Sequence, residues 1–280
     1  MKHLSKPQLA VNHILQDCAT SYRPETRGGI KKKLLMSSKY IQEASEVYDI
    51  EAQAGNWSSF CPHETVNSIL SKDDMCDVYE SKFVKSLAIR NKYYDYLMSL
   101  ANTGKCPICG IGQVSTLDHY LAKTIYPTYT VTPYNLVPVC KDCNFEKLDA
   151  RIDPDCAPLH PYYDDVDSYI WLSAQISNKQ GILVAEYFVN DELMEMDPVL
   201  FQRLKKHMQL YSLEKAYAIQ AATEIAENVP FWKKKIVEWG DVGFSDYIHE
   251  CLVSKEAFQR NTWNTALLRA LLDNINVIKG

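Results

Sequence analysis

The stretch Lys105–Lys147, KCPICGIGQVSTLDHYLAKTIYPTYTVTPYNLVPVCKDCNFEK, decides most of what the sequence predicts about this chain. It contains two Cys-x-x-Cys pairs, Cys106/Cys109 and Cys140/Cys143, which enclose a compact set of polar residues. Two intervening residues let both sulfurs of a pair face one ion, and two such pairs make a closed tetrahedral site that suits Zn²⁺. We therefore predict a structural zinc ion held by these cysteines, with no open position for a substrate.

The remaining cysteines and the N-terminus show no sign of a secreted protein. Of nine cysteines, five lie outside the paired motifs and are expected to be ordinary buried or surface thiols: Cys18, Cys61, Cys76, Cys156 and Cys251. The first residues, MKHLSKPQLAVNHILQDC, are too polar for a signal peptide. No apolar run reaches the length of about 18 residues that suggests a membrane helix. We expect a cytoplasmic protein without a membrane partner.

Length and charge limit the classes of function. The chain has 280 residues, of which 46% are hydrophobic, so it can bury a sizeable core. Its formal net charge of −5 argues against a protein that simply coats DNA, because such binding depends on lysines and arginines that replace counterions. An acidic protein acting on nucleic acid must concentrate its basic residues locally or use a partner's basic surface.

Residues 1–101 read as an N-terminal helical region. A basic segment at Ser21–Lys33 predicts a mobile connection that could contact phosphates, with a solvated loop as the alternative. Apolar residues at helical spacing predict one amphipathic helix over Cys76–Ala101, capped by Asp73 or Asp74.

Residues 166–280 read as a C-terminal hairpin followed by helices. Two β-rich runs within Tyr169–Val189 surround a turn at Asn178–Gly181. Asp197-Pro198 predicts a helix start, and a later helix over 213–228 is expected to stop near Pro230. A further helix is expected from Phe231, and the last from Ser254 or Asn261.

Between these regions, residues 102–165 read as a strand–strand–helix unit. Gln113–Leu117 predicts a strand that ends at Asp118-His119, and Tyr134–Val139 predicts a second strand that carries Asn135. A helix then begins at Cys140 or Asp142 and places Asn144 and Lys147 one turn apart. The predicted fold class is thus α+β: a small zinc-stapled ββα unit embedded between mainly helical flanks.

This unit can support a second metal site. Asp118 and Asn144 are expected to share a small cavity and to offer the oxygen ligands that suit Mg²⁺ or Mn²⁺. His119 would point to the opposite side of the pleat and be free to act as a base.

The central stretch resembles the HNH (ββα-metal) endonuclease family. The resemblance rests on LDHYLAK (Leu117–Lys123), YNLVPVC (Tyr134–Cys140) and CKDCNFEK (Cys140–Lys147), and covers about residues 100–170. More narrowly, the sequence is similar to HNH nucleases that accompany ATPases in bacterial anti-phage defence, of the Septu type and its retron-linked relatives.

The resemblance implies a metal-dependent endonuclease that hydrolyses phosphodiester bonds in DNA. In this role His119 is the general base, Asp118 and Asn144 hold the catalytic ion, and Asn135 orients the histidine. Lys147 is implied as a phosphate contact. His160 is either a phosphate or indirect site contact, or a ring packed beneath the zinc module.

The sequence departs from the family pattern at two positions. Asn144 stands where the family often has histidine, and still offers an oxygen ligand. Ala122 replaces the usual proline, which loosens a turn and removes no chemical group. Neither change implies an inactive enzyme.

Two other classes of function remain open at this stage. A zinc-ribbon module could bind nucleic acid or protein without cleavage, although such a module has no need of Asp118-His119, Asn135 and Asn144. A structural role would make the helical flanks the main feature, and fits the acidic charge best. The resemblance also implies an ATPase partner, for which the flanks would be docking surfaces.

Overall fold

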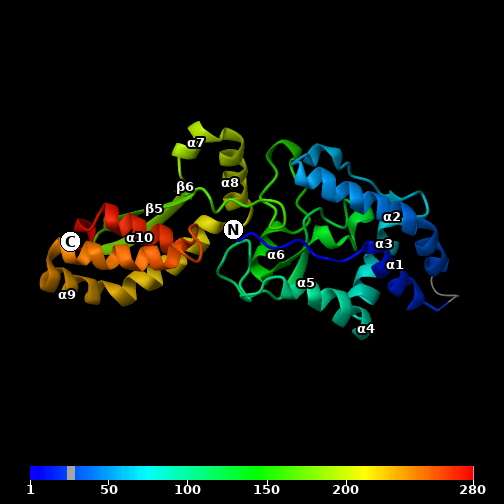
Figure 1. Ribbon diagram of the computed structural model, residues 1–280, viewed down its shortest axis with the longest axis horizontal. Coiled ribbons are helices and arrows are strands. Elements are labelled where there is room, and N and C mark those ends of the chain that lie inside the picture. The colour runs from blue at the N-terminus through cyan, green and yellow to red at the C-terminus, as the bar shows by residue number, and fades with distance from the viewer. Residues whose placement is uncertain (24–28, 280) are drawn as a thin grey trace. The chain divides into compact units, whose positions relative to one another are not determined.

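The chain is a mixture of helices and small antiparallel sheets. A computed structural model describes residues 1–23 and 29–279 (Figure 1). It contains two compact units, His3–Asp164 and Asp165–Gly280 with Met1–Lys2. The mixed α+β composition expected from the sequence is confirmed. No helix in the described ranges is long and apolar enough to cross a membrane.

The unit His3–Asp164 begins with two helices, α1 (Val11–Thr20) and α2 (Ile30–Gln53). Their inward faces repeat every three or four residues, so both helices pack against one core. Residues 24–28, the middle of the expected basic connection, lie outside the described residues. Lys31–Lys33, at its end, form the first turn of α2.

The helix expected over Cys76–Ala101 is a broken series of short helices, so that prediction was wrong. The series starts earlier, at α3, where Ser71 is the cap and Asp74 completes a capping box from the third helical position, so the cap predicted at Asp73 or Asp74 was wrong. Ser86 then has extended backbone, with ψ 111°, which ends the first part. The apolar residues of both parts face one core, so their spacing gave no sign of the break. The segments are α3 (Lys72–Asp77), π-helical η3 (Val78–Val84), α4 (Leu87–Ile89), π-helical η4 (Arg90–Tyr94) and α5 (Asp95–Ser99).

A strand–strand–helix unit follows. Strand β3 (Thr116–His119) pairs antiparallel with β4 (Leu136–Val139), with Asp118 opposite Val137. Helix α6 (Lys141–Lys147) begins directly after β4, with Cys140 as its cap. The order of elements agrees with the expectation, and their bounds differ.

The two predicted strands need correction. The first starts later than Gln113 and includes Asp118-His119. The second excludes Asn135, which ends the 3₁₀ turn η6 (Pro133–Asn135). Pro133 starts that turn because its fixed φ suits a helical first position. The remaining short elements are η2 (Trp57–Ser59), β1 (Thr65–Val66), β2 (Leu70–Ser71), η5 (Pro127–Tyr129) and η7 (Pro154–Cys156).

The unit Asp165–Gly280 contains the expected hairpin. Strands β5 (Leu172–Lys179) and β6 (Ile182–Val189) pair across a tight turn. Gln180 and Gly181 both have positive φ, 57° and 88°, as in the type I′ turn that favours hairpins. Helix α10 packs on β5, while α9 packs on β6 and on α10 (Figure 1). The helices are α7 (Glu192–Met196), α8 (Pro198–Leu210), α9 (Leu213–Glu256), α10 (Trp263–Asp273) and α11 (Asn276–Lys279).

Helix starts in this unit were predicted better than helix ends. Asp197 caps α8, where its side chain accepts a hydrogen bond of 2.9 Å from the Leu200 N–H. Helix α9 continues through Pro230, so the stop predicted there and the new helix predicted from Phe231 were both wrong. Its backbone leaves helical geometry at Gly240 instead, with φ 71° and ψ 177°. Buried Trp232 anchors the segment just after the proline, and packing outweighs the local preference there.

Candidate active site and metal centre

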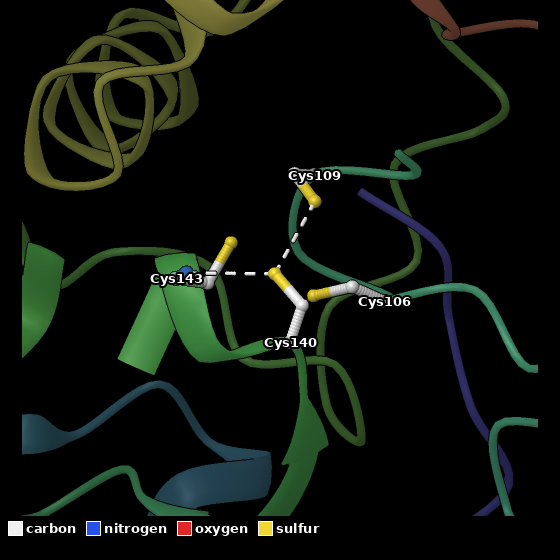
Figure 2. A group of neighbouring side chains, drawn as sticks. All are labelled: Cys106, Cys109, Cys140 and Cys143. Carbon is white, nitrogen blue, oxygen red and sulfur yellow. Dashed lines mark hydrogen bonds between the residues drawn. The ribbon is translucent and has the colours of Figure 1, made fainter. Parts of the chain in front are cut away.

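The four paired cysteines meet in one buried cluster. Their Sγ atoms all lie within 4.8 Å of one another, and Cys109 Sγ lies 3.8 Å from Cys140 Sγ. Figure 2 shows the four sulfurs converging, two from the loop after α5 and two from the start of α6. Residues about 30 apart in the chain thus form one potential ligand set.

The cluster fits a tetrahedral zinc ion. A Zn–S bond of about 2.3 Å places sulfurs about 3.8 Å apart in a tetrahedron, which is the separation of Cys109 and Cys140. Backbone N–H groups of Ile111 and Gly112 donate to Cys109 Sγ at 3.4 Å, and Cys143 N–H donates to Cys140 Sγ at 3.5 Å. These bonds favour thiolates, the form that binds metal. The four residues could hold a zinc ion.

Gly112 allows the two cysteine loops to approach closely. A Cβ atom at this position would lie 2.6 Å from Cys140 Cβ and 2.7 Å from Cys140 Sγ. No real side chain tolerates such contacts with a group fixed at a helix start. The glycine is therefore a steric requirement of the cluster.

A second feature of this unit is a cavity of about 430 Å³. It brings together Asp118 and His119 from the end of β3 and Asn144 from α6. Asp118 and Asn144 were expected to share a cavity, whereas His119 was expected on the opposite side of the pleat and instead lines the same cavity. The described lining residues also include Tyr79, Glu80, Val84, Lys85, Tyr94, Thr116, Leu117, Ala122, Lys123, Leu148 and Asp149.

Asp118 is held by Lys147. The lysine Nζ lies 3.1 Å from each carboxylate oxygen of Asp118 and donates to the His119 carbonyl at 2.6 Å. The Lys147 side chain is fully buried. Burial raises the pKa of Asp118, and Lys147 opposes that rise. The residue expected to contact a phosphate is thus, in this structure, bonded within the protein.

His119 is a neutral imidazole with a defined tautomer. Its Nε2 lies 2.9 Å from the carbonyl oxygen of Thr130. Because a carbonyl can only accept, Nε2 carries the proton and Nδ1 keeps a lone pair. Burial, aided by the charges of Lys123 and Lys147, lowers the pKa of His119 to about 3. The edge of the ring also packs against Tyr79, with centroids 4.5 Å apart.

Asn144 is the third candidate at the cavity. It is half-buried, and its side chain forms no hydrogen bond with the described residues. Its amide oxygen therefore remains available beside the Asp118 carboxylate. Oxygen donors of these two kinds suit Mg²⁺ or Mn²⁺, so the residues present fit such an ion.

Asn135 lies behind the cavity and ties the loop between β3 and β4. Its Oδ1 accepts from the Leu121 N–H at 2.6 Å and from the Tyr48 hydroxyl at 3.2 Å. Its Nδ2 donates to the carbonyls of Leu121 and Tyr129 at 2.9 and 3.1 Å. The side chain is fully buried. It therefore fixes the chain immediately after His119 without lining the cavity.

His160 lies apart from the cavity, in an aromatic cluster. Its ring stacks on Trp57 with centroids 5.8 Å apart and lies 4.3 Å from the Tyr120 ring. Nδ1 accepts from the Tyr162 N–H at 3.1 Å, and the residue is fully buried. In this structure the ring supports the fold and is not presented to a phosphate.

The N-terminal helices contribute to this cavity, which the sequence pattern did not indicate. Lys123 forms an ion pair of 2.7 Å with Glu80, although the two residues are 43 positions apart. Lys123 Nζ also lies 5.0 Å from the centroid of the Tyr79 ring. Lys123 lies only four residues after His119, so its place near the base could have been inferred from the sequence. No local motif connects it to η3, so its pairing with Glu80 could not.

Comparison with known proteins gives one informative relative. The sequence matches no protein-family model and no solved structure. It is 30% identical over 242 residues to "Protein ea31" of Escherichia phage lambda, an alignment that covers 82% of this chain and 79% of the phage protein.

Proposed function

This chain belongs to the family of the phage lambda protein Ea31, and we propose that it is a metal-dependent endonuclease of the HNH (ββα-metal) type. The relative's name states no activity, so the proposal rests on the site. The observation that carries it is one cavity lined by Asp118, His119 and Asn144, at the end of a strand and the start of a helix.

His119 supplies the base in this proposal. A base must be unprotonated before it meets water, and the lowered pKa of His119 keeps it so at neutral pH. The shift also makes the imidazole a weaker base, since general bases act best with a pKa near the operating pH. Nδ1 takes the proton of the attacking water, because Nε2 is already bonded to Thr130. The Thr130 carbonyl then stabilises the imidazolium that forms. Asn135 holds the adjoining loop and so keeps the ring in place.

Asp118 and Asn144 are the proposed holders of the catalytic ion. When bound, Mg²⁺ or Mn²⁺ would neutralise charge on the scissile phosphate and on the leaving 3′ oxygen. The Lys147 ammonium balances the Asp118 charge when that carboxylate has no other cation. The same lysine binds the His119 carbonyl and therefore links the two catalytic residues.

The four cysteines have a structural role in this account. Cys140 is both a member of the cluster and the cap of α6, the helix that carries Asn144 and Lys147. A zinc ion held there fixes the start of that helix against the loop that contains Cys106 and Cys109. The site would thereby keep its geometry without support from a large sheet.

Substrate and partner are further parts of the proposal. We propose DNA as the substrate and an ATPase of an anti-phage defence complex as the partner, following the family resemblance. The net charge of −5 supports a partner that supplies part of the DNA-binding surface. Co-purification with an ATPase encoded beside this chain would support the partner, while full activity of the isolated chain would contradict it.

Plasmid nicking tests the proposed activity. Supercoiled plasmid is incubated with the full chain and Mg²⁺ or Mn²⁺, with EDTA as the metal-free control. We expect nicking by wild type, loss of nicking in His119→Ala, and wild-type nicking in His249→Ala, which removes an exposed histidine on α9. Bound zinc without any cleavage by wild type would favour a binding module instead.

A further inference from the structure

The pair of Lys123 and Glu80 is placed where a substrate phosphate would arrive. Both residues line the cavity that contains Asp118, His119 and Asn144. The Lys123 side chain is 21% exposed and the Glu80 side chain 60% exposed. The lysine is therefore held in the wall, whereas its carboxylate partner is open to solvent.

The position of Lys123 is fixed by more than its ion pair. Its Nζ lies over the Tyr79 ring, and the edge of the His119 ring packs against that same tyrosine. Lys147, the other lysine near the base, is already committed to Asp118. Lys85 also lines the cavity, but its side chain is exposed. Lys123, whose Nζ lies over the ring that packs against His119, is thus the cation best placed to meet an anion beside that base.

A carboxylate and a phosphodiester present similar anionic oxygens to a lysine. An exposed ion pair is weak, because water screens it and ordering two long side chains costs entropy. A phosphate held in the cavity by several contacts can therefore replace Glu80 at little cost. Lys123 is therefore paired with an anion both before and after this exchange. The exchange also moves the Glu80 carboxylate away from the entering nucleic-acid strand.

We propose that Lys123 binds a phosphate of the nucleic-acid backbone next to the bond that is cut, and that Glu80 occupies this lysine until the phosphate displaces it. The inference rests on the proposed nuclease function and adds a substrate contact to it. Glu80 restricts binding in the free protein. The N-terminal helices, through η3, thereby take part in substrate recognition.

Direct binding tests this proposal without requiring cleavage. A fluorescently labelled DNA duplex is titrated with the full chain carrying His119→Ala, in Ca²⁺, and anisotropy is followed at several salt concentrations. We introduce Lys123→Gln, Glu80→Gln and the combination of both into this His119→Ala chain. The matched controls are Lys39→Gln and Glu43→Gln, which break an exposed ion pair on α2 away from the cavity.

The pair predicts a specific pattern. Lys123→Gln weakens binding about three- to tenfold and reduces the slope of log K against log salt by about 0.9, the value for one phosphate contact. Glu80→Gln strengthens binding about two- to fivefold, the range for release of an exposed ion pair. In the double variant the effect of Glu80→Gln disappears, because the two residues act through one contact. Lys123→Arg retains binding, and both controls stay near wild type.

Three results would overturn the inference. The first is that Lys123→Gln binds DNA as tightly as the control Lys39→Gln. The second is that Glu80→Gln still strengthens DNA binding when Lys123 is replaced by Gln. The third is absence of DNA binding in the His119→Ala background. Failure of the nuclease proposal is seen separately, as absence of nicking by wild type, and the binding series still decides the role of Lys123 in that case.

Discussion

At His119, burial and the charges of two lysines act in one direction on a single imidazole. They lower its pKa to about 3, against a hydrogen bond from Nε2 to Thr130 that raises it. A base of this kind is available throughout the neutral range.

The titration of His119 gives the first prediction. In the metal-free full chain, its ring NMR signals should not shift between about pH 5 and 8, whereas an ordinary histidine titrates near 6.5. The folded pKa is below the unfolded one, so this residue adds stability above about pH 6.5 and that stability is lost as the pH falls toward 3. A midpoint near 6.5 would contradict the assignment.

The ion pair of Lys147 and Asp118 gives the second prediction. Lys147→Met leaves a buried carboxylate without its partner and should lower the free energy of unfolding by about 3–5 kcal/mol. The double variant Lys147→Met/Asp118→Leu should recover most of that loss, since both charges are gone. Urea unfolding measures both effects. Lys39→Met, in an exposed pair, should change the free energy by less than about 1 kcal/mol, and an equal loss there would contradict the account.

At the scale of elements, the loop that contains Cys106 and Cys109 depends on Gly112 for its approach to α6. Gly112→Ala places a Cβ against Cys140, so we expect loss of most bound zinc and a destabilisation of about 1–3 kcal/mol. Metal analysis and thermal unfolding report these effects. Gly110→Asn is the control, because its φ of 71° is one that asparagine tolerates and its surroundings are open. Full zinc content in Gly112→Ala would contradict the steric role.

Helix α9 contains a proline and a glycine whose replacement by alanine should change the stability of the chain in opposite directions. Pro230 is exposed and lies within regular helix, so Pro230→Ala should stabilise the chain, by up to about 3 kcal/mol. Gly240 has a backbone conformation that is essentially restricted to glycine, so Gly240→Ala should destabilise it by about 1–3 kcal/mol. Thermal unfolding measures both changes: the melting temperature should rise for Pro230→Ala and fall for Gly240→Ala. Stabilisation by both variants would contradict the assigned kink.

The elements that could be predicted from sequence are those whose signals are local. The two-residue spacing within each Cys-x-x-Cys motif predicted which cysteines act together. A short turn predicted the hairpin of β5 and β6. The break at Ser86 and the passage of α9 through Pro230 depend on packing, which the sequence pattern does not reveal. The second strand begins later than predicted because Pro133 starts a turn before β4.

The candidate site could be predicted in part, for the same reason. Asp118, His119 and Asn144 lie in one short stretch and do share a cavity. Glu80 reaches that cavity from a π-helical segment far away in the chain, so no motif links it to Lys123. Lys147 was expected at a phosphate and is found beside Asp118, since its buried ammonium needs an anionic partner within the protein.

At the scale of the whole molecule, the candidate site lies within one compact unit, His3–Asp164. That unit contributes the cysteine cluster, the cavity and the Lys123–Glu80 pair. The unit Asp165–Gly280 carries the hairpin and the long helix α9. The described cavity lining carries two lysines, Lys85 and Lys123, and three acidic residues, Glu80, Asp118 and Asp149, in a chain of net charge −5.

The rate of plasmid nicking as a function of Mn²⁺ concentration tests the central claim, that one cavity combines a base with a metal site. His119→Ala should lower the maximal rate at saturating Mn²⁺ by about 10²–10⁴-fold, the usual contribution of a general base, and leave the required Mn²⁺ concentration near that of wild type. Asn144→Ala should raise the Mn²⁺ concentration needed for half-maximal rate. Wild-type curves from both variants would contradict the account.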